Sequence, residues 1–343
     1  MDIPFINKPL SLLLQLFAGW FGNSFAAAVA VFTLIINLIL IPLTIKSQKS
    51  SVQQMRIKPK LDELKKKYGN DRQKMAQAQQ KLYQDEGVSM SGGCLPMIFR
   101  LLIMMSIYFL ILSPLTYMSG ADKSDVDKLS AAISERVEYL EKNDKTTYNE
   151  IKDEVSWSGK GKNNQLAITK IIRNPELKDK IFDEASFKKV KQSYDRIVEK
   201  DNVKKINYDL FSIDLTETPS FSFDFSNFKP IWLIPIGAFL AQILTSFLSM
   251  LIQKKSNPDA PNMAVMMFTM PLITLWIGFV VPGGVGFYWI CSSLIGGVLQ
   301  SVIQVVYGPN VLLARERAKE LSKQLDFEQK QIEKFNRQEP AEN

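Results

Sequence analysis

Side chains that could do chemistry are scarce in the long apolar runs of this 343-residue chain. Arg100 is the only charged residue inside any of them. A charge at the centre of a spanning helix costs at least about 2.5 kcal/mol, and it almost always faces a protein interior or a water-filled cavity. Arg100 therefore indicates a polar, anion-attracting site, unless its long side chain snorkels to the headgroups.

Other chemistry has little support in the sequence. The chain has no histidine, the commonest general base and metal ligand, which also excludes Ser-His-Asp and Cys-His arrangements. Its two cysteines, Cys94 and Cys291, lie in or beside apolar runs and lack the spacing of a metal site or a disulfide framework. We expect no catalytic residues, no metal and no cofactor, and therefore not an enzyme.

Five apolar runs predict an all-α membrane protein with five transmembrane helices. Each has about the 20 residues needed to cross the hydrocarbon core, where only helices and closed barrels satisfy the backbone. Pro282-Gly283-Gly284 favours a tight turn between the last two runs over one long helix. The predicted spans are 25–45, 91–117, 230–253, 263–281 and 282–307.

The distribution of lysine and arginine predicts the orientation. Residues 46–90 hold 11 basic and 5 acidic residues, and the loop 254–262 holds Lys254 and Lys255 against Asp259. The positive-inside rule places both segments and the polar tail 308–343 in the cytosol. The N-terminus and the segment 118–229, whose charges nearly balance, are then outside. This is the pattern of a multi-pass protein of the cell membrane.

The remaining segments also read as helices. Residues 1–24 suit an interfacial helix with Trp20 and Phe21 at headgroup level, since Lys8 alone is too little charge for a signal peptide. Residues 118–229 predict a mainly helical outer domain of unknown role. The tail predicts a helix that continues from the last span and then becomes disordered. The outer domain's clearest apolar stripe is Val126, Leu129, Ile133, Val137 and Leu140.

The cytosolic segment 46–90 predicts a helical hairpin. Gly69-Asn70-Asp71 breaks two apolar stripes that have helical spacing. The basic faces suit anionic lipid, a ribosome or an RNA surface, or they only solvate the loop and set topology. The stripes are Ile57, Leu61, Leu64 and Tyr68, and then Met75, Ala78 and Leu82.

Polar residues also mark the apolar runs. In lipid, such side chains either line a hydrated site or hold helices together, and the sequence does not separate the two. The candidates for contact with a substrate are Thr33 in the first run, Gln242 and Ser246 in the third, and Tyr288, Ser292 and Gln300 in the fifth, with Thr245, Ser249 and Gln304 on the same stripes.

Three strings resemble the YidC membrane protein insertase family. They are NKPLSLLLQLFAGWFGN with the later IPLT, MRIKPKLDELKKKYGNDRQKMAQAQQKLYQDEGVSMSGGCLP, and GVGFYWICSS. The resemblance covers about residues 1–117 and 230–310, so 118–229 looks like a lineage-specific insertion. It implies a hydrophilic groove in the membrane, open to the cytosol, that takes the polar part of a substrate while the apolar segment slides along spans three and five into lipid.

The same resemblance implies the partners. They would be nascent membrane proteins and the lipid bilayer, with the ribosome and the Sec translocon as further partners and no small-molecule substrate. The protein would act as an insertase and chaperone, alone or with the translocon. No nucleotide would be consumed, because transfer of apolar side chains into hydrocarbon drives the process.

The chain departs from the family pattern at one position. The family usually carries an arginine in span one, five residues before the proline that corresponds to Pro42, and here that position is Asn37. Asn37 and Arg100 each lie nine residues from a cytosolic span end, roughly 13 Å deep. We hypothesise that Arg100 replaces the missing charge from the neighbouring helix, and that Asn37 hydrogen-bonds to it or to the substrate.

Two other classes of function compete with an insertase. A transporter or channel could use Arg100 to bind an anion, but transporters usually show repeated sets of spans and this sequence shows none. An intramembrane enzyme lacks histidine, paired carboxylates and a nucleophile motif. A groove open to lipid would separate an insertase from a sealed pore.

Overall fold

The computed structural model describes residues 4–69, 71–89, 95–155, 164–220, 228–256 and 264–338. Within these ranges the chain is almost entirely helical, as predicted, and its only strands form one short hairpin. Cys94 and most of the loop 254–262 lie outside the described residues.

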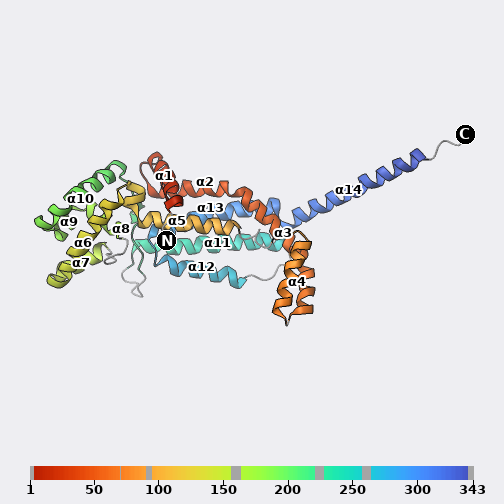
Figure 1. The fold of residues 1–343 in the computed structure, drawn as a ribbon, viewed down its shortest axis with the longest axis horizontal. Coiled ribbons are helices and arrows are strands. Elements are labelled where there is room, and N and C mark those ends of the chain that lie inside the picture. Colours follow the sequence, from red (N-terminus) through yellow and green to blue (C-terminus); the bar gives the residue numbers. More distant parts are fainter. Residues whose placement is uncertain are drawn as a thin grey trace. The chain divides into compact units, whose positions relative to one another are not determined.

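Figure 1 shows the order and arrangement of the helices. The apolar ones are α1 (Pro4–Trp20), α2 (Phe25–Ile39), α5 (Leu95–Leu112), α11 (Leu233–Ser256), α12 (Ala264–Gly278) and α13 (Gly283–Tyr307). The polar ones are α3 (Ile41–Tyr68), α4 (Arg72–Asp85), α6 (Lys123–Asn143), α7 (Lys145–Val155), α8 (Gln165–Arg173), α9 (Pro175–Ile181), α10 (Glu184–Lys204) and α14 (Pro309–Gln338). The strands are β1 (Asp209–Leu210) and β2 (Ile213–Asp214).

Two helical stretches among the described residues are long and apolar enough to cross a membrane by length and composition. They are Pro230–Ile252 and the stretch that begins at Gly283. The pair α2–α3 makes a third if it is one broken span, and Ile98–Leu112 and Thr269–Gly278 are shorter apolar helices. Each predicted span thus corresponds to an apolar helix, and the number five stays a prediction.

The first predicted span is not one straight helix. Helix α2 ends at Ile39, α3 begins at Ile41, and the two are bent by 50°. Pro42 in the first turn of α3 explains the bend, because proline has no N–H to donate to the carbonyl four residues back and its ring crowds that carbonyl.

The chain divides into two compact units. The first comprises 1–37, 100–244 and 264–296, and the second comprises 38–99, 245–263 and 297–343. The main core of the first unit joins α1, α2, α5 and α13 through fully buried side chains, among them Leu14, Phe25, Phe32, Ile107 and Ile111. The predicted turn at 282–284 is present, with Val285 N–H donating to Pro282 O at 2.9 Å.

The segment between α5 and α11 contains two different structures. Helices α6–α10 gather in one group with a core of their own, which buries the whole predicted stripe from Val126 to Leu140 (Figure 1). Residues 206–215 instead pack into the core of the apolar helices, through Ile206, Tyr208 and Leu215. Only the first part therefore forms a helical group with a core of its own.

We call residues 207–217, which contain the hairpin β1–β2, the strap. Its main chain is bonded to the first residues of two apolar helices. Phe25 N–H of α2 donates to Asn207 O at 2.8 Å, and Asn207 N–H donates to Asn23 O at 2.8 Å. At α13, Gly284 N–H donates to Leu215 O at 2.7 Å and Gly283 N–H to Glu217 O at 2.8 Å. These bonds satisfy N–H groups that a helix start leaves without an intrahelical partner.

In the second unit, α3 and α4 form the predicted hairpin. Asp71 caps α4 by accepting from Lys74 N–H at 3.0 Å, and this hydrogen bond lowers the pKa of Asp71. Glu86 accepts from Lys60, which lowers the pKa of the Glu86 carboxyl. The tail is helical, and α14 begins at Pro309, two residues after α13 ends at Tyr307.

Candidate functional site

Helix α2 carries the first polar stripe. Thr33 and Asn37 lie one turn apart and are buried, with 1% and 9% of their surfaces exposed. Thr33 Oγ1 donates to Val29 O at 2.6 Å, and Asn37 Nδ2 donates to Thr33 O at 2.8 Å. The amide nitrogen of Asn37 is thus used within its own helix, and the amide oxygen is the group that reaches beyond it.

Arg100 on α5 approaches the same place from a second helix. A Cβ built on Gly296 of α13 would lie 3.2 Å from Asn37 Oδ1 and 3.6 Å from Arg100 Nη2. Both side chains therefore border one point beside Gly296. A residue with a side chain at this position would have to share that space with them.

The guanidinium of Arg100 is incompletely used. Its Nε atom is buried, and no acceptor among the described residues takes a hydrogen bond from it. A buried donor left without a partner costs free energy, more so when the group is charged. Such a donor therefore marks a place where water or a ligand can be bound.

Helix α13 adds hydroxyl groups on the face that carries Gly296. Tyr288, Ser292 and Gly296 are spaced by four residues and so share one helix face. Tyr288 is 5% exposed, and its hydroxyl lies near the Ser292 side chain and within the electrostatic influence of Arg100. Three helices thus supply one cation, an amide oxygen and three hydroxyls. We call Thr33, Asn37, Arg100, Tyr288, Ser292 and Gly296 the arginine site.

The other predicted residues lie elsewhere or in the other unit. Gln242 is half-buried on α11 in the first unit, while Ser246 and Gln300 are half-buried residues of the second unit. Sequence reasoning missed Gly296, because a glycine carries no functional group. The available signal was its position, one turn beyond Ser292 on the polar stripe of α13.

The arginine site can bind negatively charged groups through Arg100. It contains no carboxylate or imidazole, and no cluster of potential metal ligands occurs among the described residues. A fixed guanidinium with nearby hydroxyls suits carboxylates and backbone carbonyls, which accept hydrogen bonds. The arrangement supports recognition of polar peptide groups.

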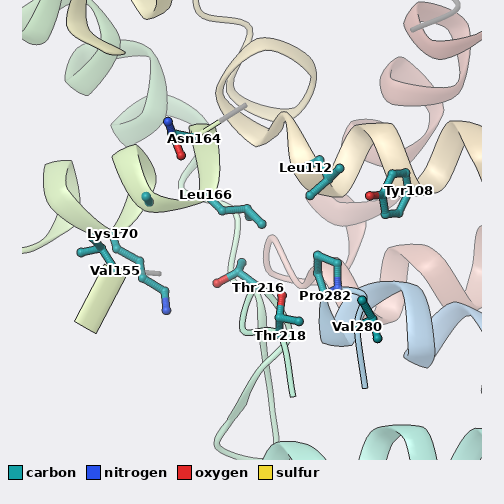
Figure 2. Close-up of a pocket in the computed structure, with 11 residues that line it drawn as sticks. Tyr108, Leu112, Val155, Asn164, Leu166, Lys170, Thr216, Thr218, Val280 and Pro282 are labelled. Carbon is teal, nitrogen blue, oxygen red and sulfur yellow. The ribbon is translucent and has the colours of Figure 1, made fainter. Parts of the chain in front are cut away.

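A separate cavity of about 210 Å³ lies between the helical domain and the apolar helices (Figure 2). Lys170 of α8 carries the only charge among the described residues that line it, and Thr216 and Thr218 of the strap region add hydroxyls. Tyr108 and Pro282 border it from α5 and the α12–α13 turn. No residue of the arginine site lines it, so the two are distinct.

Apolar helices of membrane-spanning composition, with an arginine whose Nε is buried among them, define a class of protein: a multi-pass α-helical membrane protein. The sequence profile of one family, described as 60Kd inner membrane protein, matches residues 16–153 and 186–308. The match includes most of 118–229, so the expectation that this whole segment is an insertion outside the family pattern is wrong. These ranges cover most of the chain, so the chain belongs to this family, the YidC family.

Curated relatives agree with this membership. An insertase named YidC from Alkalihalophilus pseudofirmus is 40% identical over 115 residues, which cover 32% of this chain and 46% of that protein. Proteins of the same name from Haemophilus ducreyi and Ectopseudomonas mendocina are 44% and 37% identical over 106 and 108 residues. These alignments cover 31% and 32% of this chain but only 19% and 18% of the relatives. In all three, the matched part is less than half of the relative's length.

Proposed function

We propose that this protein is a membrane protein insertase and chaperone. In this proposal five spans surround a hydrophilic groove open to the cytosol, the N-terminus lies outside and the tail lies in the cytosol. The polar part of a substrate enters the groove, and its hydrophobic segment moves into lipid. Family membership supports the class of function, and the ribosome and the Sec translocon are candidate partners.

The observation that carries the mechanism is the arginine site. A guanidinium with a buried, unused Nε lies among apolar helices, where retaining it without a role is costly. We propose that water occupies the site at rest and that acidic or carbonyl groups of a substrate replace it. Exchange of water for a charge-assisted hydrogen bond would hold the polar segment only weakly, which suits a transient passage.

Complementation tests the function directly. Cells depleted of their own insertase would express this protein, and protease protection would report insertion of a single-span substrate with an acidic outer tail. Rescue by the wild type supports the proposal. Absence of rescue at normal membrane levels would contradict it for this substrate class.

Moving the charge back to α2 should preserve activity. We expect the double variant Asn37→Arg with Arg100→Gln to insert the substrate nearly as well as the wild type, because both side chains border the same point beside Gly296. The single variant Arg100→Gln is the control and should lose insertion. A double variant that is stable but inactive would show that the charge must come from α5.

Filling the space at Gly296 should weaken insertion. A leucine there must displace Asn37 Oδ1 or the guanidinium, which lie 3.2 and 3.6 Å from the added Cβ, so we expect severalfold slower insertion by Gly296→Leu. Leucine is a better helix former than glycine, so a loss would not come from weaker helix propensity.

Val298→Leu, at an exposed position of the same helix, is the matched control for added bulk. Unchanged insertion by Gly296→Leu would mean that the guanidinium does not need its observed position. The same assay as for the exchange variant reports both results.

A further inference from the structure

The turn of the strap hairpin has an unusual residue at its tip. β1 and β2 pair through Leu210 and Ile213, which leaves Phe211 and Ser212 as a two-residue turn. Both have positive φ, 48° and 67°. Two-residue hairpin turns of this kind favour asparagine and glycine, because a Cβ is disfavoured at positive φ. Phenylalanine is thus placed where local backbone preference opposes it.

Burial within the protein does not explain this phenylalanine. Phe211 is 93% exposed, whereas its neighbours Leu210 and Ile213 pack against the core of the apolar helices. The hairpin therefore presents one large aromatic side chain outward and holds it there through the packing of its strands.

The place of the hairpin suggests what covers the ring. The strap is bonded to the first residues of α2 and α13, so the hairpin lies at the ends of two apolar helices. Asn207 of the strap also bonds to the α1–α2 turn at Asn23, and that turn follows two further exposed aromatics, Trp20 and Phe21. Aromatic side chains concentrate where spanning helices meet the headgroups.

We propose that Phe211 inserts into the outer leaflet and anchors the strap to the lipid interface. The partner is neutral or zwitterionic lipid, because the strap itself carries Asp209, Asp214 and Glu217 and no basic residue. Apolar burial rather than charge attraction drives the contact. The anchor holds the segment that caps α2 and α13, and it does not depend on insertase activity.

Spin labelling of the full chain tests the location. A nitroxide on Phe211→Cys, in a background with Cys94→Ser and Cys291→Ala, is measured in phosphatidylcholine vesicles by its accessibility to oxygen and to a water-soluble nickel complex. We expect preferential access of oxygen, as for a label on the exposed Leu240 of α11. A label on the exposed Tyr139 of α6 is the aqueous control.

Hydrogen exchange tests the native side chain, since a nitroxide is itself apolar. Asparagine suits the positive φ, so Phe211→Asn should slow exchange of the Leu210 and Ile213 amides if the turn is held by its own geometry alone. We expect the opposite in phosphatidylcholine nanodiscs, severalfold faster exchange, because the variant loses the lipid anchor.

Three results would count against the proposal. In the first, the label at position 211 is as accessible to the nickel complex as the label at position 139, and Phe211→Asn slows amide exchange. The second is lipid-like shielding that appears only after another protein is added, which would assign the tip to a protein partner. The third, stronger immersion in anionic than in neutral vesicles, would contradict the assignment to neutral lipid.

Discussion

Replacing Arg100 with alanine should reduce insertion of a substrate with an acidic outer tail by about tenfold to a hundredfold. Hydrogen bonds to charged groups contribute about 1.5–3 kcal/mol, and each 1.4 kcal/mol is a factor of ten. Arg100 supplies the only charge of the arginine site, and its neighbours Asn37, Tyr288 and Ser292 offer only neutral groups. Initial insertion rates in depleted cells measure the effect.

The chemistry of the substrate makes this prediction specific. A substrate whose outer tail has its carboxylates changed to amides should depend less on Arg100. It cannot make the charge-assisted contact with either the wild type or the Arg100→Ala variant. Arg100→Lys should retain part of the activity, since lysine keeps the charge but not the planar set of donors. Leu101→Ala, at an exposed position on the same helix, controls for loss of bulk in α5.

Equal insertion by Arg100→Ala and the wild type, at equal membrane levels, would show that insertion does not require Arg100. Arg100 would then act as a snorkelling residue, and the insertase class would rest on the family alone. Loss of insertion for all substrates alike would instead indicate a folding defect. Membrane levels of Arg100→Ala below those of Leu101→Ala and Arg100→Lys would support that explanation.

The sequence predicted most of what composition and helical spacing control. Long apolar runs are unambiguous, so the helices and the break at Gly69 could be placed in advance. Counting from span ends put Asn37 and Arg100 at one depth, and in the structure both border Gly296. The number of spans and the groove stay predictions.

What the sequence hid depends on contacts between distant residues. The main chain of the strap hydrogen-bonds to residues near 24 and near 283, and no local sequence pattern predicts such long-range bonds. Its hairpin turn is Phe-Ser rather than Asn-Gly, so the usual turn signal is missing as well. The bend at Leu40 was foreseeable from Pro42, but proline near a span end is tolerated in either a straight or a broken helix.

Removing the carboxylate of Asp201 should loosen the strap and the helical domain together. Asp201 lies on α10 with only 4% of its side chain exposed. It accepts from Arg173 Nε at 2.8 Å and Nη2 at 2.9 Å, and from Ser119 Oγ at 2.6 Å. Arg173 Nη1 also donates to Ile206 O at 3.1 Å, just before the strap. One carboxylate thus ties α8, α10 and the π-helix Leu115–Ser119 after α5 to the residues that lead into the strap.

We expect Asp201→Ala to cost about 3 kcal/mol of local stability. Breaking a buried ion pair by removing one partner costs 3–5 kcal/mol, because the other charge stays buried and unpaired. Arg173 keeps 34% of its side chain exposed, so the low end applies. At 1.4 kcal/mol per factor of ten, amides of residues 206–215 should exchange about a hundredfold faster in nanodiscs.

Two variants separate the ion pair from ordinary surface effects. Asp179→Ala removes the exposed partner of Lys178, a pair 3.0 Å apart in the same domain, and should change exchange little. The double variant Arg173→Met with Asp201→Ala removes both charges and should recover part of the loss, because no partly buried guanidinium is left without its carboxylate. If Asp201→Ala accelerated exchange only within α6–α10 and left residues 206–215 unchanged, the strap would be held by its bonds to α2 and α13, and the helical domain would contribute nothing to its stability.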